Sequence, residues 1–170
     1  MNTEQNKISV SIQMTTKDMF DFLYQHSYHG VMGFVNYGFS LVALMALLCG
    51  FGKGNSIATV ALVILALLFT VINPFLLLQK ADKQVKGTPM FQKPLQYTFD
   101  ENGFTVTQDG ESAQAEWSNV LLIRETKKTI ALYLGAANAT VLPKREIGKE
   151  LNAIKEYIRT AVPEVAKNLR

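Results

Sequence analysis

Two histidines, His26 and His29, are the first residues whose type and spacing could do chemistry. On a helix, a spacing of three places two imidazoles on one face, where they could share a metal ion. A third ligand is missing from their neighbourhood, because the only cysteine, Cys49, would lie about 30 Å away along an intervening helix. We therefore expect histidines that are solvated or in contact with lipid headgroups, no bound metal and no cofactor.

Basic residues form a second group, whose chemistry would be the binding of anions. Near a membrane, each lysine or arginine adds about 1 kcal/mol of attraction to anionic lipid. The alternative is ordinary solvated charge, which after an apolar run also sets membrane orientation. A single tryptophan could anchor a ligand or partner, unless it fills the core of a small sheet. The candidate lipid- or partner-binding residues are Lys80, Lys83, Lys86, Lys93, Lys144, Arg145 and Trp117.

Recognisable catalytic patterns are missing from the sequence. It contains no GxxxxGK[ST], GxGxxG, HExxH, GxSxG or paired-cysteine motif. The acidic pairs Asp100/Glu101 and Asp109/Glu111 fall in predicted turns, where solvated carboxylates are expected. We therefore expect that the protein is not an enzyme, and a membrane enzyme is the less favoured alternative.

The elements that must position these residues are dominated by two apolar runs. Of 170 residues, 48% are hydrophobic and 18% are charged, yet Gly30–Leu78 contains one charge, Lys53. As helices, the runs 31–52 and 56–78 would be about 33–35 Å long, enough to cross a hydrocarbon core of about 30 Å. A buried hairpin in a soluble protein is the alternative, but the rest of the chain is too short to wrap both helices. We predict a transmembrane hairpin.

The distribution of charge predicts how the hairpin is oriented. Residues 79–93 hold four lysines, whereas the glycine-rich connection 50–55 holds one. The positive-inside rule then places both termini in the cytoplasm of a multi-pass inner-membrane protein. Residues 94–170 balance ten basic against ten acidic residues, so nucleic acid is not an expected partner.

The flanking segments predict a strand and helix before the hairpin and a small β domain after it. Residues 8–12 alternate apolar and polar, and Thr15 and Asp18 form a capping-box pattern at the start of an aromatic-rich interfacial helix. Turns at 100–103 and 109–110 separate the first of six predicted strands, which form a meander that one helix closes, and the N-terminal strand completes the sheet. The predicted fold class is membrane α+β, with segments 1–29 (strand and interfacial helix), 30–79 (hairpin), 80–93 (basic linker) and 94–170 (β domain).

The layout resembles the YcxB-like bacterial membrane proteins. The matching stretches are Met14–Asp18, Phe99–Gly103, Glu116–Val120 and Leu142–Arg145, with Asn119 where the pattern more often has Asp. The resemblance implies a C-terminal domain similar in plan to the pleckstrin-homology-like (PH-like) fold. It implies an architecture and no chemistry.

The sequence thus favours an integral inner-membrane protein that acts as a non-enzymatic, membrane-tethered interaction or regulatory module. Its expected partners are membrane lipid and either another protein or a second copy of the chain. The alternative function is the sensing of anionic lipid headgroups by the cytosolic domain.

Overall fold

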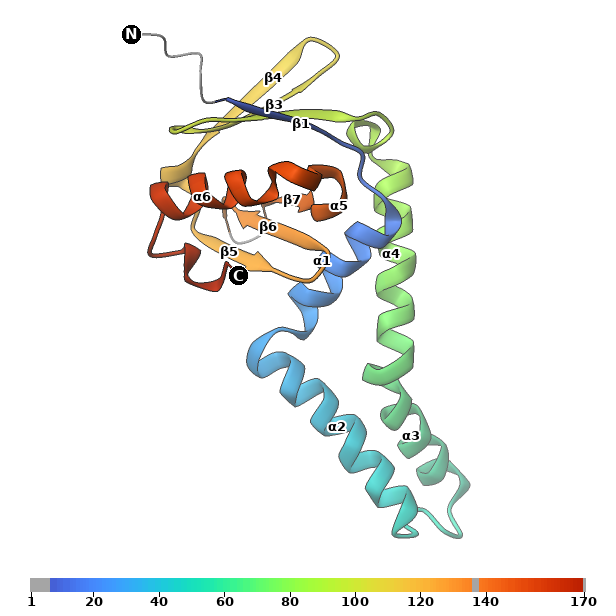
Figure 1. Ribbon diagram of the computed structural model, residues 1–170. Coiled ribbons are helices and arrows are strands. Elements are labelled where there is room, and N and C mark those ends of the chain that lie inside the picture. The colour runs from blue at the N-terminus through green and yellow to red at the C-terminus, as the bar shows by residue number, and fades with distance from the viewer. Residues whose placement is uncertain (1–6, 136–137, 170) are drawn as a thin grey trace, which may run out of the picture.

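The computed structural model describes residues 7–135 and 138–169. Its helices α2 and α3 extend as a hairpin away from a β domain, which consists of β1–β7 with α5 and α6 (Figure 1). In chain order the elements are β1 (Ile8–Ile12), α1 (Thr16–Tyr28), α2 (Gly30–Leu48), α3 (Ser56–Leu67), α4 (Asn73–Gly87), β2 (Leu95–Phe99), β3 (Gly103–Gln108), β4 (Glu111–Glu116), β5 (Leu122–Glu125), β6 (Thr129–Tyr133), β7 (Ala139–Pro143), α5 (Lys144–Ile147) and α6 (Leu151–Ala161).

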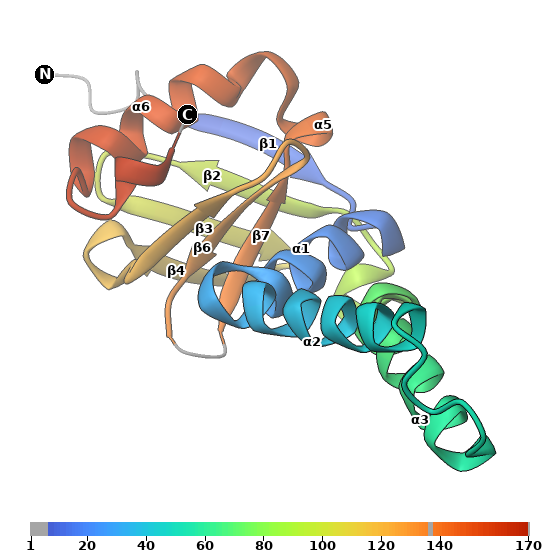
Figure 2. The same ribbon diagram turned by 90° about the horizontal axis from the view of Figure 1, so that it is seen from below.

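The strands form two antiparallel sheets, ordered β1-β2-β3-β4 and β5-β6-β7 (Figure 2). The prediction of a single six-stranded meander was therefore wrong. A 3-10 turn, Trp117–Asn119, follows β4 and ends its ladder with β3, so that β5 begins a separate sheet. The predicted turns are confirmed. In the second, Asp109 (φ 51°) and Gly110 (φ 88°) take the positive φ values that a two-residue type I′ hairpin requires.

The N-terminal strand completes the first sheet, as predicted. β1 pairs with β2 from Ile8 opposite Phe99 to Ile12 opposite Leu95, although the whole hairpin lies between them in the chain. The core lies between the two sheets and α6, whose Ile154 and Ile158 are fully buried. Its fully buried large side chains include Ile12, Phe99, Trp117, Ile123, Ile130, Leu142, Ile154 and Ile158.

The hairpin has the opposite arrangement, with apolar side chains on its outside. Ser40 Oγ donates to the Leu65 carbonyl at 3.2 Å and so links α2 to α3. The exposed large apolar side chains of the two helices include Val31, Phe34, Phe39, Val42, Met45, Leu48, Ile57, Val60 and Ile64.

The second apolar run continues into the basic segment as one helix. α3, a π-helical stretch at Leu68–Ile72 and α4 make 32 continuous residues, Ser56–Gly87. The predicted linker 80–93 is thus helical as far as Gly87. The cause is an apolar face on α4 that is buried mainly against α1, formed by Leu77, Ala81 and Val85.

One helix in the described part of the chain, Ser56–Gly87, is long and apolar enough to cross a membrane, and 11% of its most apolar window is buried. A second segment meets the same length and hydropathy criterion only if α1 and Gly33–Leu48 are counted as one span. These two helices meet at a bend of 79°. α2 alone has 19 residues and is about 28 Å long. By length and composition, the first predicted span therefore has weaker support than the second.

A tyrosine stabilises the long helix where its hydrogen bonding changes. In the π-helical stretch the Asn73 amide donates to the Leu68 carbonyl, and Pro74 has no N–H to offer the next carbonyl, that of Phe69. Tyr28 Oη donates to the Phe69 carbonyl at 2.7 Å and accepts from Asn73 Nδ2 at 2.9 Å. The end of α1 is thereby fastened to the long helix.

α1 lies between α4 and the second sheet (Figure 1). Its Met19 and Leu23 are buried in one cluster with side chains of α4 and with Val141 of β7. Phe22 packs against Tyr133 of β6, with ring centroids 6.0 Å apart. The buried face of the predicted interfacial helix is therefore used to join the β domain to α4.

Candidate functional site

The first turn of α1 is held by an ion pair with the β domain. The predicted capping box is confirmed, since Thr15 Oγ1 accepts from the Asp18 amide and Asp18 Oδ2 accepts from the Thr15 amide at 3.1 Å. Arg145 Nη2 donates to the same Oδ2 and to the Gln13 carbonyl, each at 2.8 Å. Arg145 thus joins the start of α5 to the segment before α1.

The environment of Asp18 favours its ionised form. Burial on its own would raise the pKa of this carboxyl, but hydrogen bonds from Arg145 and Thr15 outweigh it and hold the pKa below its usual 3.8. The same hydrogen bond to Asp18 raises the pKa of Arg145. Both groups therefore stay charged at neutral pH, and this pair is a structural contact between α1 and α5.

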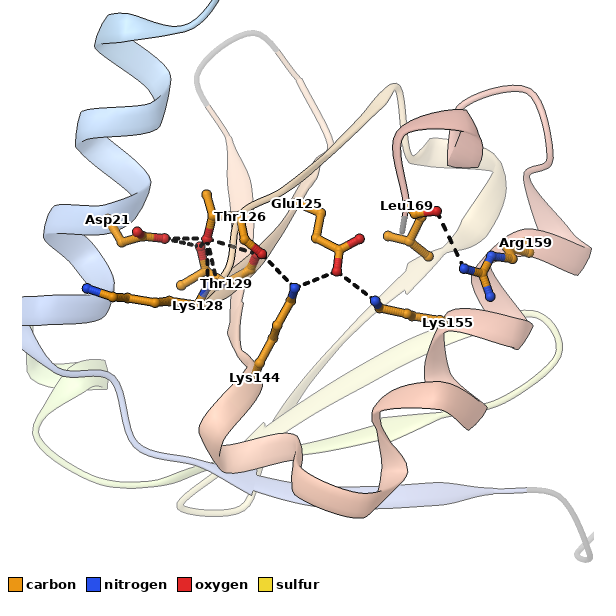
Figure 3. Close-up of polar contacts among 9 residues, drawn as sticks. All are labelled: Asp21, Glu125, Thr126, Lys128, Thr129, Lys144, Lys155, Arg159 and Leu169. Atoms are coloured by element: carbon orange, nitrogen blue, oxygen red, sulfur yellow. Dashed lines mark hydrogen bonds and ion pairs between the residues drawn. The ribbon is translucent and has the colours of Figure 1, made fainter.

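A second charged group lies inside the β domain (Figure 3). Glu125 Oε1 accepts from Lys144 Nζ at 2.5 Å and from Lys155 Nζ at 2.6 Å. The side chains of Glu125 and Lys155 are 4% and 8% exposed, and that of Lys144 is 18% exposed. Desolvated charges of this kind need their partners, so the three residues link β5, α5 and α6.

The turn between β5 and β6 is fastened to α1 by a third polar contact (Figure 3). Thr126 Oγ1 and Thr129 Oγ1 donate to Asp21 Oδ2 at 2.5 and 2.7 Å. The Lys144 amide donates to the Lys128 carbonyl at 2.8 Å. The turn, the first half of α1 and the start of α5 are consequently held next to one another.

These three segments enclose a surface cavity of about 720 Å³, which we call the basic cavity. One carboxylate, Asp18, lines it, and Arg145 neutralises that group. The cationic side chains that line it are Lys17, Lys127, Lys128, Lys144 and Arg145. The cavity therefore carries a local excess of positive charge and is suited to an anionic ligand.

The structure brings only two of the predicted binding residues to this cavity, Lys144 and Arg145, and both hold internal ion pairs. Of the α4 lysines, Lys86 pairs with Asp82 at 2.7 Å. Lys93 pairs with Asp109 at 2.7 Å. Lys80 and Lys83 are exposed, and neither has an ion-pair partner in residues 7–135 or 138–169.

Trp117 is 2% exposed and stacks on Phe99, with ring centroids 6.2 Å apart. Its Nε1 donates to the Asp100 carbonyl at 2.9 Å. A ligand or partner could reach the indole only if the domain opened. Trp117 is therefore a core residue, which was the second of the two roles considered for it from the sequence.

Sequence reasoning did not single out Lys17, Lys127 and Lys128. The signal was weak, since Lys127 and Lys128 form an adjacent pair in a short turn and Lys17 follows the helix cap. The two histidines do not form a metal centre with other ligands, because the described residues contain no group of three or more His, Cys, Asp or Glu that could hold an ion. His26 Nδ1 instead lies 3.3 Å from Tyr133 Oη.

Comparison with known families gave a match in the C-terminal part of the chain. Residues 99–158 match the family model described as YcxB-like protein. The chain carries a YcxB-like domain. This confirms the resemblance for the C-terminal part of the chain. The YcxB-like domain runs from the end of β2 to the last turn of α6 and includes Trp117, Lys127, Lys128, Lys144 and Arg145. Comparison with curated proteins gave no match, and comparison with solved structures gave none.

Proposed function

We propose that the protein crosses the cell membrane twice, through α2 and α3, with both termini in the cytoplasm. The outward-facing apolar side chains of the hairpin support this proposal, since Phe34 and Ile57 are 81% and 84% exposed. Apolar side chains exposed in this way along two helices are unfavourable in water and favourable in lipid. The lysines that follow the second helix support the orientation.

The arrangement of strands and helices in the β domain supports a PH-like plan for this domain. It has antiparallel sheets of four and three strands and a C-terminal helix that packs into the core. In this plan, α1–α4 are an insertion between β1 and β2. The insertion carries the domain at the membrane surface.

We propose that the function is that of a non-enzymatic interaction or regulatory module held at the inner leaflet. The observation that carries this proposal is the packed junction between hairpin and domain. α4 continues from α3 without a break, and α1 packs against both α4 and the second sheet. Two charged groups at the junction, Asp18 and Arg145, form an ion pair with one another. The junction therefore fixes where the domain stands above the membrane and which faces it presents.

The outer edge of β4 is the surface that best suits a protein partner. β4 is the last strand of its sheet, and residues 111–114 are exposed. Its free backbone N–H and C=O groups can accept a further strand from a neighbouring membrane protein or from a second copy of the chain.

A crosslinking experiment in native membranes tests the interaction. A photoreactive amino acid at Gln114 should give a discrete adduct that identifies the partner strand. The same amino acid at exposed Glu164, away from the sheet edge, is the matched control. Equal labelling at both positions, or no adduct at Gln114, would exclude the β4 edge as the interaction surface.

The native cysteine tests the topology separately. Cys49 lies at the end of α2 and is exposed. In intact spheroplasts a membrane-impermeant maleimide should label Cys49, whereas a Cys49→Ser, Ser118→Cys variant should react only after permeabilisation. The reverse pattern would contradict the orientation, and a protein that stays soluble without detergent would contradict membrane insertion.

Binding of anionic lipid headgroups is the second candidate function. It is favoured by the exposed Lys80 and Lys83, which lie on α4 directly after the apolar run. These two lysines stand at the height at which the hydrocarbon core would end.

A further inference from the structure

We propose that the basic cavity binds the phosphate group of an anionic membrane lipid through Lys17, Lys127 and Lys128. This inference rests on the proposed membrane insertion and assigns a specific ligand site to the junction. The three ammonium groups have no hydrogen-bond or ion-pair partner in the part of the chain that the structure describes. They therefore differ from Lys144 and Arg145, whose charges are already used in ion pairs.

The three lysines are brought together by fixed contacts. Lys17 stands on the first turn of α1, which the capping box and Arg145 hold in place. Lys127 and Lys128 belong to the β5–β6 turn, which Thr126 and Thr129 fasten to Asp21 of α1 (Figure 3). An anion entering between these segments meets ammonium groups from both sides. Little backbone ordering is needed on binding, because the segments are already joined.

The height of the cavity above the apolar run matches that of the lipid headgroup layer. Thr16 Oγ1 donates to Asp82 Oδ1 of α4 at 3.1 Å, so the first turn of α1 stands level with Asp82. Asp82 follows Leu78, the last residue of the apolar run, by one helical turn, which is about 6 Å along the axis. The headgroup layer on each side of a bilayer is also about 5–8 Å thick. The cavity therefore stands at the level of lipid phosphates.

The size and charge of the cavity fit a phosphate-bearing headgroup. Its volume of about 720 Å³ lies within the range of small-molecule sites and exceeds what a bare phosphate ion needs. Lysine ammonium groups bind phosphate as point charges without demanding one geometry, so several headgroups that share this group can enter. Lys144 and Arg145 form part of the cavity wall, and their ion pairs leave the ligand to the other three lysines.

Lipid binding by the full-length protein in a non-ionic detergent tests the proposal. The probes are short-chain phosphatidic acid and phosphatidylglycerol, compared with zwitterionic phosphatidylcholine. The cavity variant is Lys17→Gln/Lys127→Gln/Lys128→Gln. The matched control, Lys7→Gln/Lys149→Gln/Lys167→Gln, changes net charge equally at exposed lysines outside the cavity. We expect Kd for the anionic lipids to be lower than for phosphatidylcholine, to rise at least about tenfold in the cavity variant and to stay unchanged in the control.

Each other outcome overturns the proposal. Equal losses in the two triple variants would indicate general charge attraction, and equal Kd values for anionic and zwitterionic lipid would exclude headgroup selectivity. Competition by inorganic phosphate at submillimolar concentration would assign the cavity to a soluble phosphate compound. Tryptophan fluorescence of each variant checks folding, and the single variant Lys128→Gln, expected to lose about fivefold, replaces the triple variant if that does not fold.

The two proposals fail in different ways. If Cys49 is labelled from outside and the cavity variant binds lipid normally, the membrane topology stands and the headgroup site falls. If the protein remains soluble without detergent, both fall together.

Discussion

The hairpin and the β domain are built from similar apolar residues placed in opposite ways. Ile57 of α3 is 84% exposed, whereas Ile130 and Ile154 of the β domain are fully buried. Polar groups follow the same contrast. In the hairpin Ser40 bonds inward to a carbonyl of α3, while the β domain has polar residues such as Lys7 and Glu164 on its surface. The difference supports the proposed membrane insertion of the hairpin, since lipid favours an apolar outside and water an apolar inside.

Charge is the exception to this contrast, because the β domain also buries an ionic group. The first prediction concerns Glu125→Gln, which removes the carboxylate shared by Lys144 and Lys155. We expect it to lower the free energy of unfolding of the β domain by about 3–5 kcal/mol. The fluorescence of Trp117, the only tryptophan, reports this unfolding in detergent. Glu164→Gln, which touches only an exposed pair with Lys167, should cost less than about 1 kcal/mol.

The second prediction compares one substitution in the two regions. Ile154→Ala leaves a cavity in the β-domain core and should cost about 2–5 kcal/mol by the same fluorescence measurement. Ile57→Ala, at the exposed start of α3, should leave the unfolding midpoint of the β domain unchanged. Similar losses from both variants would mean that the hairpin is packed against protein and would remove the contrast.

The third prediction uses pH at the contact between the regions. Because the pKa of folded Asp18 lies below 3.8, its ionised form stabilises the fold fully above that pH, and the contribution is lost as pH falls through the folded pKa. Arg145→Ala should cost about 1–2 kcal/mol at neutral pH, a modest value since the Arg145 side chain is 48% exposed. Asp18→Asn should flatten the acid limb of the stability profile. If Asp18→Asn loses stability at low pH as steeply as the unchanged protein, the loss is caused by other carboxylates.

The smallest expected effect is that of Tyr28→Phe. It leaves the Phe69 carbonyl without its hydroxyl donor, at a cost of about 1 kcal/mol. Amide hydrogen exchange in α4 should therefore speed up about fivefold, with exchange in β6 unchanged as the internal control. No change in α4 would show that another group satisfies the carbonyl.

Local patterns predicted much of the fold. Asp109-Gly110 has the chemistry that a tight hairpin needs, and the alternation in 8–12 matches the strand that pairs with β2. The division into two sheets was missed because it depends on the turn at Trp117–Asn119, whose consequence is seen only when both sheets pack. The helical continuation beyond Leu78 did have a signal, the spacing of four between Leu77, Ala81 and Val85.

The candidate site was harder to predict than the fold. The sequence singled out Lys144 and Arg145 as candidate binding residues, but charge alone cannot distinguish a free cation from a paired one. Lys17 and Lys127 share a cavity only because Asp21 contacts the β5–β6 turn. No spacing rule connects positions so far apart, so their grouping required the tertiary structure.

The pairing of β1 with β2 has a consequence for biosynthesis. β1 leaves the ribosome first, but its partner follows only after residues 13–94 have been synthesised. During that interval Ile8, Val10 and Ile12 have no β2 strand to pair with, and on the proposed topology both apolar helices enter the bilayer. Closure of the four-stranded sheet is therefore a late event, which joins the two ends of the α1–α4 insertion only after all of its helices have been synthesised.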